Sequence, residues 1–435
     1  MRRGFAVFLA AVSVVAPAAG QRAADTSTSD YVVAGVHIIQ RRSAANDIVA
    51  VNAYFLGGTR LTSFANAGIE PFLLAVSERG TARYSREDIR KMLARSGSTI
   101  VVSAERDWSI LGLRTTVGGL RDAWAAFSER IIAPRLDEAD IAAERTQALA
   151  GIAQRQDSPD EWAAHLADSV AFAGHPYGID PAGTARSITG LTATTLRAFH
   201  REQFVKTRLL LVIVGDVPRL VVDSLVEATL GRLPAGNYRW SLPDTMARRP
   251  TSVYREARAL PTNYVVGYAP GPRADDPDYD ALRVACAILG GRLFAEVRSR
   301  RTLTYAVDAP FAERAVSAAG LYVSTTDPVA TLAAMRDEVR ALQEMQIDGR
   351  SLLPLVQQFI TEYFLSNETN AAQAGFLARS LLYRGDAQAG STFASKLRAV
   401  TPADIQRVMR RYFHDLAFAY VGDPAKLPNS ALDWR

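Results

Sequence analysis

Cysteine and histidine, which serve most often in disulfides, metal sites and nucleophilic catalysis, are scarce in this chain of 435 residues. The single cysteine, Cys286, excludes an intramolecular disulfide, and its apolar surroundings (ALRVACAILGG) predict a buried, inert thiol. None of the five histidines lies three or four residues from another, so no helix presents two imidazoles to one metal ion. The sequence also contains no GxSxG, GxxxxGKS/T or CxxC, which excludes the common hydrolase, phosphate-binding and dithiol motifs.

The net charge of the chain is also small. The formal net charge is +5, with 48% hydrophobic and 22% charged residues, and no basic run carries interleaved aromatic residues. This composition excludes a nucleic-acid partner and leaves enough apolar residues for a core in each half. Outside the N-terminus, no apolar segment reaches the ~20 residues that a membrane-spanning helix needs, so no membrane insertion of the mature chain is expected.

The N-terminus has the pattern of a secretory signal peptide. Two arginines precede an apolar run from Phe5 to Ala16, and small residues follow. A membrane anchor is disfavoured because this run of about twelve residues is too short to cross a hydrocarbon core of ~30 Å as a helix. No cysteine follows the run, so lipoprotein processing is not expected. Residues 1–20 are therefore predicted to be removed, with cleavage after Ala18 or Gly20, and the product to be periplasmic or secreted.

One stretch of sequence occurs twice. LTATTLRAFHREQFVKTRLLLVIVGDVP begins at residue 191, and VTPADIQRVMRRYFHDLAFAYVGDP begins at residue 400. Each predicts a capped amphipathic helix, a hydrophobic strand and a Val-Gly-Asp turn; the expected caps are Thr192 or Thr194 in the first copy and Thr401, with Asp404, in the second. The copies lie about 209 residues apart, which is the size of a domain rather than of a solenoid repeat. The chain is therefore predicted to be a duplication.

Hydrophobic periodicity predicts a similar order of elements in both halves. In the first half we expect a pair of strands at 32–39 and 48–55, followed by helices at 69–77 and 86–95. A hairpin at 98–103 and 108–116 comes next, and then three long helices at 119–132, 137–155 and 159–173. In the second half we expect strands near 263–268, 303–308 and 320–325, helices near 279–289, 329–345, 351–365 and 369–384, and a helix or turn at 290–302. Strands followed by runs of helices predict an α+β fold in each half. We place the domains at 31–234 and 251–435, joined by a linker at 235–250.

A series of short motifs runs through both halves. The first half contains, in order, Gly68-Ile69, Gly80-Thr81, Tyr84-Ser85, Glu144-Arg145, His175-Pro176-Tyr177-Gly178, Leu191-Thr192 and Val214-Gly215-Asp216, and the second contains Leu289-Gly290-Gly291, Arg298 and Tyr305. In this order the motifs resemble the insulinase/pitrilysin/mitochondrial-processing-peptidase family of zinc peptidases, family M16, over nearly the whole mature chain. The resemblance implies two homologous LuxS/MPP-like domains, each a mainly antiparallel sheet packed with helices, that form half of a clamshell.

In that family the helix before the Gly-Thr motif carries HxxEH, in which two histidines bind zinc and the glutamate polarises the attacking water. Here Pro71 and Ala75 stand where the histidines would be, and Leu74 stands where the glutamate would be. Of the family's distal pair of glutamates, Glu144 is present, but the other falls near Gly151, and residues 146–156 contain no carboxylate. Such side chains do not ligate zinc. The resemblance therefore implies a chain with no catalytic residues and no metal of its own, which is not an enzyme by itself.

The second half keeps an arginine and a tyrosine of the family pattern. The segment LFAEVRSRRTLTYAVDA carries Arg298 and Tyr305 at the matching positions, with Thr302 in place of the usual glycine. The resemblance implies that both side chains bind a substrate backbone carbonyl near the scissile bond, which suits them because both donate hydrogen bonds. The alternative is Arg298 on a solvated helix face and Tyr305 packed under a strand. The edge strand expected at Ser98–Ser103 has Val-Val where catalytic members tend to show Asn-Ala, and would pair with an extended peptide by β-augmentation.

Two functional hypotheses from different classes remain. The first is a catalytically inactive M16-type subunit that pairs with a zinc-bearing M16 partner carrying HxxEH and helps to bind extended peptide substrates for proteolysis. Such a division of labour is a known arrangement in the family. The alternative is a non-enzymatic peptide-binding or scaffold homodimer in the cell envelope, built on the same fold. In both, this chain binds no cofactor, and the zinc of the first hypothesis belongs to the partner.

Overall fold

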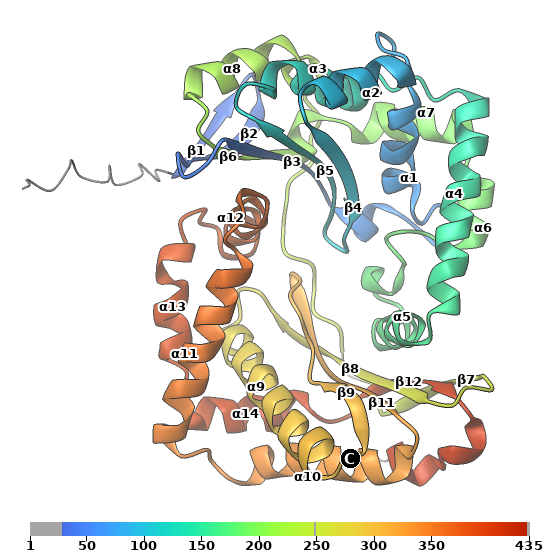
Figure 1. The fold of residues 1–435 in the computed structure, drawn as a ribbon, viewed down its shortest axis with the longest axis vertical. Helices are drawn as coiled ribbons and strands as arrows, with labels where there is room; N and C mark the ends of the chain where they lie inside the picture. The colour runs from blue at the N-terminus through green and yellow to red at the C-terminus, as the bar shows by residue number, and fades with distance from the viewer. Residues whose placement is uncertain (1–27, 248, 433–435) are drawn as a thin grey trace, which may run out of the picture.

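Two six-stranded sheets, one in each half of the chain, form the framework of the molecule (Figure 1). The computed structural model describes residues 28–247 and 249–432. The predicted signal peptide, residues 1–20, lies outside them. Helices pack on both sheets, and each sheet contains a single parallel pair of strands among antiparallel ones. The predicted α+β fold, with a mainly antiparallel sheet in each half, is confirmed.

The strands of the first sheet lie in the order β1 (Thr28–Val33), β2 (Val36–Arg42), β6 (Leu209–Gly215), β3 (Ile48–Leu56), β5 (Trp108–Thr116) and β4 (Thr99–Ala104). The predicted pairing of 32–39 with 48–55 is wrong. Ala34 and Gly35, at φ values of 48° and 84°, turn the chain back within the first of these segments. Strand β6 then lies between β2 and β3, parallel to β2 and antiparallel to β3.

The second sheet repeats this arrangement. Its strands lie in the order β10 (Phe311–Ala312), β11 (Val316–Thr325), β8 (Asn263–Arg273), β12 (Ala417–Gly422) and β7 (Ser252–Ala257), and β9 (Thr304–Asp308) also pairs with β11. The order β12, β8, β11, β9 matches β6, β3, β5, β4 of the first sheet. The duplication expected from the sequence is therefore visible in the topology.

The helices follow the predicted order, with additions. Those of the first half are α1 (Ile69–Val76), α2 (Arg86–Arg95), α3 (Leu120–Ile132), α4 (Glu138–Asp157), α5 (Pro159–Ala171), α6 (Ala185–Gly190), α7 (Ala193–Gln203) and α8 (Arg219–Ala228). Those of the second half are α9 (Asp278–Leu293), α10 (Pro328–Glu344), α11 (Gly349–Ser366), α12 (Asn370–Arg384), α13 (Gly390–Arg398) and α14 (Pro402–Tyr412). Capping boxes begin α7 at Thr192, rather than Thr194, and α14 at Thr401, which confirms the repeated caps.

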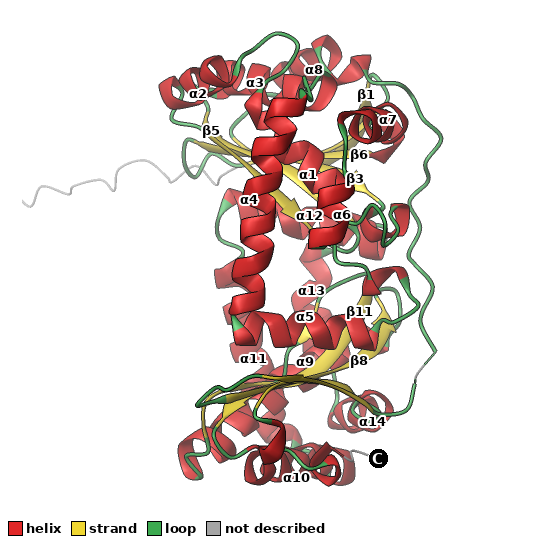
Figure 2. Cartoon of the chain, turned by 90° about the vertical axis from the view of Figure 1, so that its right-hand side faces the viewer, coloured by secondary structure: helices red, strands yellow, loops and turns green. Residues whose placement is uncertain are grey.

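Each half sends one helix onto the sheet of the other half, as Figures 1 and 2 show. Helix α5 packs on β8 and β12, where Ala163, Leu166 and Ala167 share a core with Val266, Ala419 and Val421. Helix α12 packs on β3 and β6, where Leu377, Leu382 and Tyr383 share a core with Tyr54, Leu210 and Val212. Because α5 and α12 each bury an apolar face on the sheet of the other half, two hydrophobic cores hold the halves together.

Two buried aspartates add polar contacts across the same junction. Asp168 on α5 pairs with Arg106 of the first half at 2.5 Å and with Arg314 of the second half at 2.7 and 2.9 Å. Asp107, between β4 and β5, accepts a hydrogen bond from the hydroxyl of Tyr383 on α12 at 2.7 Å. Each aspartate therefore joins residues that are far apart in the sequence.

An extended segment connects the two halves. Residues 234–247 and 249–251 form no helix or strand. Within this segment the Trp240 ring lies 6.2 Å from that of Trp108, and its Nε1 donates a hydrogen bond to the Leu382 carbonyl at 2.8 Å. The segment is thus fixed to both halves. No helix within the described ranges is long and apolar enough to cross a membrane.

Candidate functional site

Helix α1 carries the positions where the family resemblance expects zinc ligands. It begins after Gly68, whose φ of 80° is one that glycine adopts without strain. The side chain of Leu74 is fully buried in the first core, so packed hydrocarbon fills the position of the expected general base. Pro71 and Ala75, four residues apart, are both half-buried. Pro71 does not interrupt the helix because N–H groups of the first turn have no helical acceptor.

The carboxylates near these positions already have cationic partners. Glu70 on α1 lies 2.9 Å from the guanidinium of Arg208, and burial raises the pKa of Glu70 although Arg208 acts in the opposite direction. Glu144 on α4, which packs against α1, accepts a hydrogen bond from Arg79 at 2.9 Å. Gly151, further along α4, is exposed, and a Cβ added there would meet open space.

The side chains present at this location do not fit a zinc ion. Proline, leucine, alanine and glycine offer no ligand, and the remaining carboxylate is neutralised by an arginine. Over residues 28–247 and 249–432, no three His, Cys, Asp or Glu side chains gather in a group that could hold a metal ion. Cys286 is buried in α9, which confirms that prediction, and burial raises the pKa of its thiol.

The structure brings Arg298 and Tyr305 together in the second half. Arg298 lies in a π-helical turn, η6 (Phe294–Arg300), that continues α9, and Tyr305 lies in strand β9. The guanidinium carbon of Arg298 is 4.8 Å from the ring centres of both Phe294 and Tyr305. Tyr305 is 81% exposed, so the alternative in which it packs under a strand is wrong. Among the described residues Arg298 makes no ion pair, which leaves its donors available to a ligand.

Between these two residues the backbone is strained at Thr302, where family members usually have glycine. Its φ is 51°, a left-handed value that a β-branched residue rarely adopts. We expect Thr302→Gly to raise the free energy of unfolding by about 0.5–1 kcal/mol, because relief of the Cβ clash exceeds the extra flexibility of glycine in the unfolded chain. Urea unfolding followed by circular dichroism measures the difference. Thr302→Ala, which keeps Cβ, is the control, and equal stability of the two variants would contradict this source of strain.

Strand β4, predicted at Ser98–Ser103, lies at the edge of the first sheet and pairs with β5. The predicted hairpin with 108–116 is confirmed. Alternate side chains of β4 are exposed, and Val101 keeps 47% of its surface. The free edge therefore presents backbone donors and acceptors to which an extended chain could add.

Two contacts of the candidate site were missed from the sequence. Arg79 is the partner of Glu144, but the two are 65 residues apart and no local signal connects them. Phe294 stacks on Arg298, and here the spacing of four residues within a predicted helical stretch was a usable signal.

The fold and the candidate site define a class of protein: a duplicated α+β chain with two sheets of matching strand order and, among the described residues, no set of metal ligands at the helix where the resemblance expects them. The family model described as "Peptidase M16 inactive domain" matches residues 190–352. The fold is that of a Pseudomonas fluorescens crystal structure with the same description, with a TM-score of 0.81, 21% identity and coverage of 91% of this chain and 98% of that one. A protease from Helicobacter pylori superposes with a TM-score of 0.83 at 16% identity, over 91% of this chain and 99% of that one. Over residues 190–352 the chain is thus similar to the peptidase M16 family, and its fold is shared with solved structures of that description.

Curated proteins are also similar to this chain. A protein of Streptomyces coelicolor named as an uncharacterized zinc protease is 25% identical over 374 residues, which cover 81% of this chain and 80% of that protein. One of Mycobacterium leprae, with the same description, is 24% identical over 63% of each chain. Subunit 1 of the mitochondrial cytochrome b-c1 complex of Caenorhabditis elegans is 22% identical over 88% of this chain and 85% of that one.

Proposed function

We propose that this chain is a non-catalytic M16 subunit that assembles with a zinc-bearing M16 partner and helps to bind extended peptides for proteolysis. The observation that carries the proposal is an asymmetry between the halves. The first half has non-ligating side chains at Pro71, Leu74, Ala75 and Gly151 and keeps only Glu144, which Arg79 holds, whereas the second half presents Arg298 and Tyr305 side by side with the tyrosine exposed. The chain retains groups that bind a peptide and lacks those that activate water.

In the assembled peptidase, the roles would be divided by chemistry. The partner would supply HxxEH, zinc and the attacking water. Arg298 and Tyr305 would donate hydrogen bonds to a peptide carbonyl and hold its oxygen in place as negative charge develops there. The edge of β4 would hold an extended peptide through backbone hydrogen bonds. Two fission yeast subunits of mitochondrial processing peptidase, alpha and beta, are each 22% identical to part of this chain, and their pairing supports a two-subunit assembly.

The site of action proposed here is the periplasm or the extracellular space. The support is the N-terminal sequence alone, with its two arginines and apolar run. Fusing residues 1–25 to alkaline phosphatase, which is active only after export, tests this part. Activity of the fusion in intact cells supports export, and an inactive cytoplasmic fusion contradicts it.

The assembly is tested by mixing the purified mature chain with an HxxEH homologue from the same organism. We expect a 1:1 complex on size-exclusion chromatography and peptide turnover at least tenfold above that of the homologue alone, because the donors of this chain complete the site. The matched control is the same homologue with the glutamate of HxxEH changed to glutamine, which should assemble without turnover. Failure of the two wild-type chains to associate would contradict the pairing.

The second candidate is a non-enzymatic scaffold or peptide-binding homodimer in the cell envelope. The similarity to a cytochrome b-c1 complex subunit, which covers 88% of this chain, favours it. A stable homodimer that does not bind HxxEH homologues would support this candidate against the first.

A further inference from the structure

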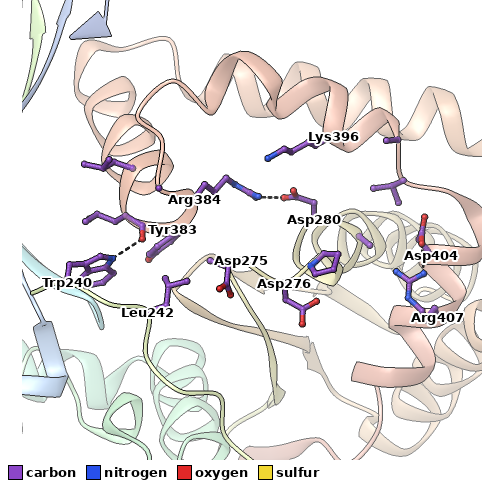
Figure 3. Close-up of a pocket in the computed structure, with 18 residues that line it drawn as sticks. Trp240, Leu242, Asp275, Asp276, Asp280, Tyr383, Arg384, Lys396, Asp404 and Arg407 are labelled. Atoms are coloured by element: carbon purple, nitrogen blue, oxygen red, sulfur yellow. Dashed lines mark hydrogen bonds and ion pairs between the residues drawn. The ribbon is translucent and has the colours of Figure 1, made fainter. Parts of the chain in front are cut away.

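A cavity of about 780 Å³ lies in the second half, away from Arg298 and Tyr305, with which it shares no lining residue. The N-terminal end of α9, the C-terminal end of α12, helices α13 and α14 and the connecting segment near Trp240 line it, and it is open to solvent (Figure 3). Its size is that of small-molecule sites, which occur preferentially where separate parts of a protein meet. Trp240 closes one side, and it is fixed there by its hydrogen bond to the Leu382 carbonyl.

The wall of the cavity is largely apolar. The residues that supply this surface are Trp240, Leu242, Leu381, Leu382, Ala399 and Val400. Such a surface favours a ligand with an aliphatic or aromatic side chain, because burial of that side chain releases water from both partners.

Most of the charges that line the cavity neutralise one another. Asp275 is held by Arg273 at 2.6 and 2.7 Å, and Asp280 is held by Arg384 at 2.6 Å. Asp404 is paired with Arg407 in the same way. A ligand would have to break these pairs to use their charge, so they contribute little to its recognition.

Two lining charges have no such partner. Among the described residues, neither Lys396 nor Asp276 makes an ion pair; Asp276 Oδ1 accepts only the backbone N–H of Asp278, at 2.8 Å. In the view of Figure 3, Lys396 lies on one side of the Arg384–Asp280 pair and Asp276 on the other. The cavity thus offers one ammonium without an ion pair and one carboxylate with free acceptor capacity, on opposite sides of the Arg384–Asp280 pair.

We propose that this cavity binds a small zwitterion with an apolar side chain, either a short peptide or a single amino acid with free termini. The carboxylate of the ligand pairs with Lys396, its ammonium pairs with Asp276, and its side chain packs near Trp240. The inference goes beyond the proposed function and needs no partner subunit, so its test on the isolated chain is independent of that assembly.

Isothermal titration calorimetry of the mature chain tests the proposal with four probes. They are leucyl-alanyl-phenylalanine with free termini, its N-acetylated form, its C-amidated form, and free phenylalanine. We expect a dissociation constant below 1 mM for the free tripeptide and binding about threefold to fivefold weaker for each blocked form. Tighter binding of phenylalanine than of the tripeptide would identify the amino acid as the ligand.

Variants locate the site. Lys396→Gln should weaken the free tripeptide about threefold to fivefold and leave the amidated form unchanged. Asp276→Asn, which keeps an acceptor for the Asp278 amide, should weaken the free form and leave the acetylated form unchanged. Ala399→Trp, at an exposed position, should abolish binding by filling the cavity, and Lys426→Gln, on a distant exposed turn, is the control. No binding of any probe at 5 mM, or binding that Ala399→Trp and Lys396→Gln leave unchanged, would overturn the proposal.

Discussion

If the chain assembles with a zinc-bearing partner as proposed, Arg298→Ala combined with Tyr305→Phe is expected to lower kcat/KM of the assembly for a peptide substrate about 100-fold. A donor that stabilises developing charge on a carbonyl oxygen typically contributes a factor of ~10²–10³ to turnover. Both donors are well suited to that task, because Tyr305 is 81% exposed and Arg298 has no ion pair with another described residue. If they act on the transition state, kcat falls more than KM changes, and steady-state kinetics of the mixed subunits separates the two.

The control for this variant lies two residues from Arg298. Arg300 is exposed and forms an ion pair with Glu296 at 2.5 Å. Arg300→Ala therefore removes a neighbouring positive charge and leaves Arg298 and Tyr305 in place. Its turnover should stay within about twofold of the wild type. Size-exclusion chromatography must show intact assembly for both variants. Full turnover by the double variant would remove Arg298 and Tyr305 from the site.

The second large effect concerns stability. Asp168→Ala is expected to lower the free energy of unfolding by about 3–5 kcal/mol, because it leaves Arg106 and Arg314 without their shared carboxylate in a buried junction. Urea unfolding monitored by circular dichroism measures this loss. Glu87→Ala, which removes an exposed pair with Lys91 on α2, should change the midpoint little. A change no larger than that of the control would contradict the role of Asp168 in joining the halves.

The same carboxylate gives a pH dependence with a definite sign. Burial alone would raise the pKa of Asp168, but Arg314 and Arg106 outweigh it, so the pKa is lowered from its ordinary value. A lowered pKa means that the stabilisation is fully present above the unfolded pKa of about 3.9 and is lost as the pH falls through the folded value. The stability difference between wild type and Asp168→Asn should therefore be constant from pH 7 to about pH 5 and shrink below about pH 4. A difference that persists unchanged at pH 3 would contradict the pairing.

Local signals in the sequence predicted much of the fold. The capping boxes at Ser85 and Thr401 were predictable because each involves a cap and a residue three positions later. The duplication was predictable because the repeated helix and strand are also local patterns, each contained in one short stretch of sequence. By contrast, the insertion of β6 between β2 and β3, and the exchange of α5 and α12, depend on contacts between segments far apart in the chain. Helical periodicity shows that α5 has an apolar face but not which sheet covers it.

The candidate site was likewise predictable where it depends on local sequence and not where it depends on contacts between distant segments. That Pro71, Leu74, Ala75 and Gly151 offer no zinc ligand is a property of side-chain chemistry, and the sequence alone establishes it. That Glu144 is held by Arg79 required the packing of α1 against α4. The glycine that family members usually have at the position of Thr302 indicated a positive φ there, because glycine adopts such a φ without strain.

The central claim is that this chain contributes no zinc chemistry of its own. Its most direct test is the zinc content and peptidase activity of the purified, isolated mature chain, by plasma emission spectroscopy and cleavage of a fluorogenic peptide library. We predict less than about 0.1 zinc per chain after dialysis and no turnover above buffer, both unchanged by added zinc, because the positions that would bind zinc hold proline, leucine, alanine and glycine. One zinc per chain together with chelator-sensitive turnover would contradict it.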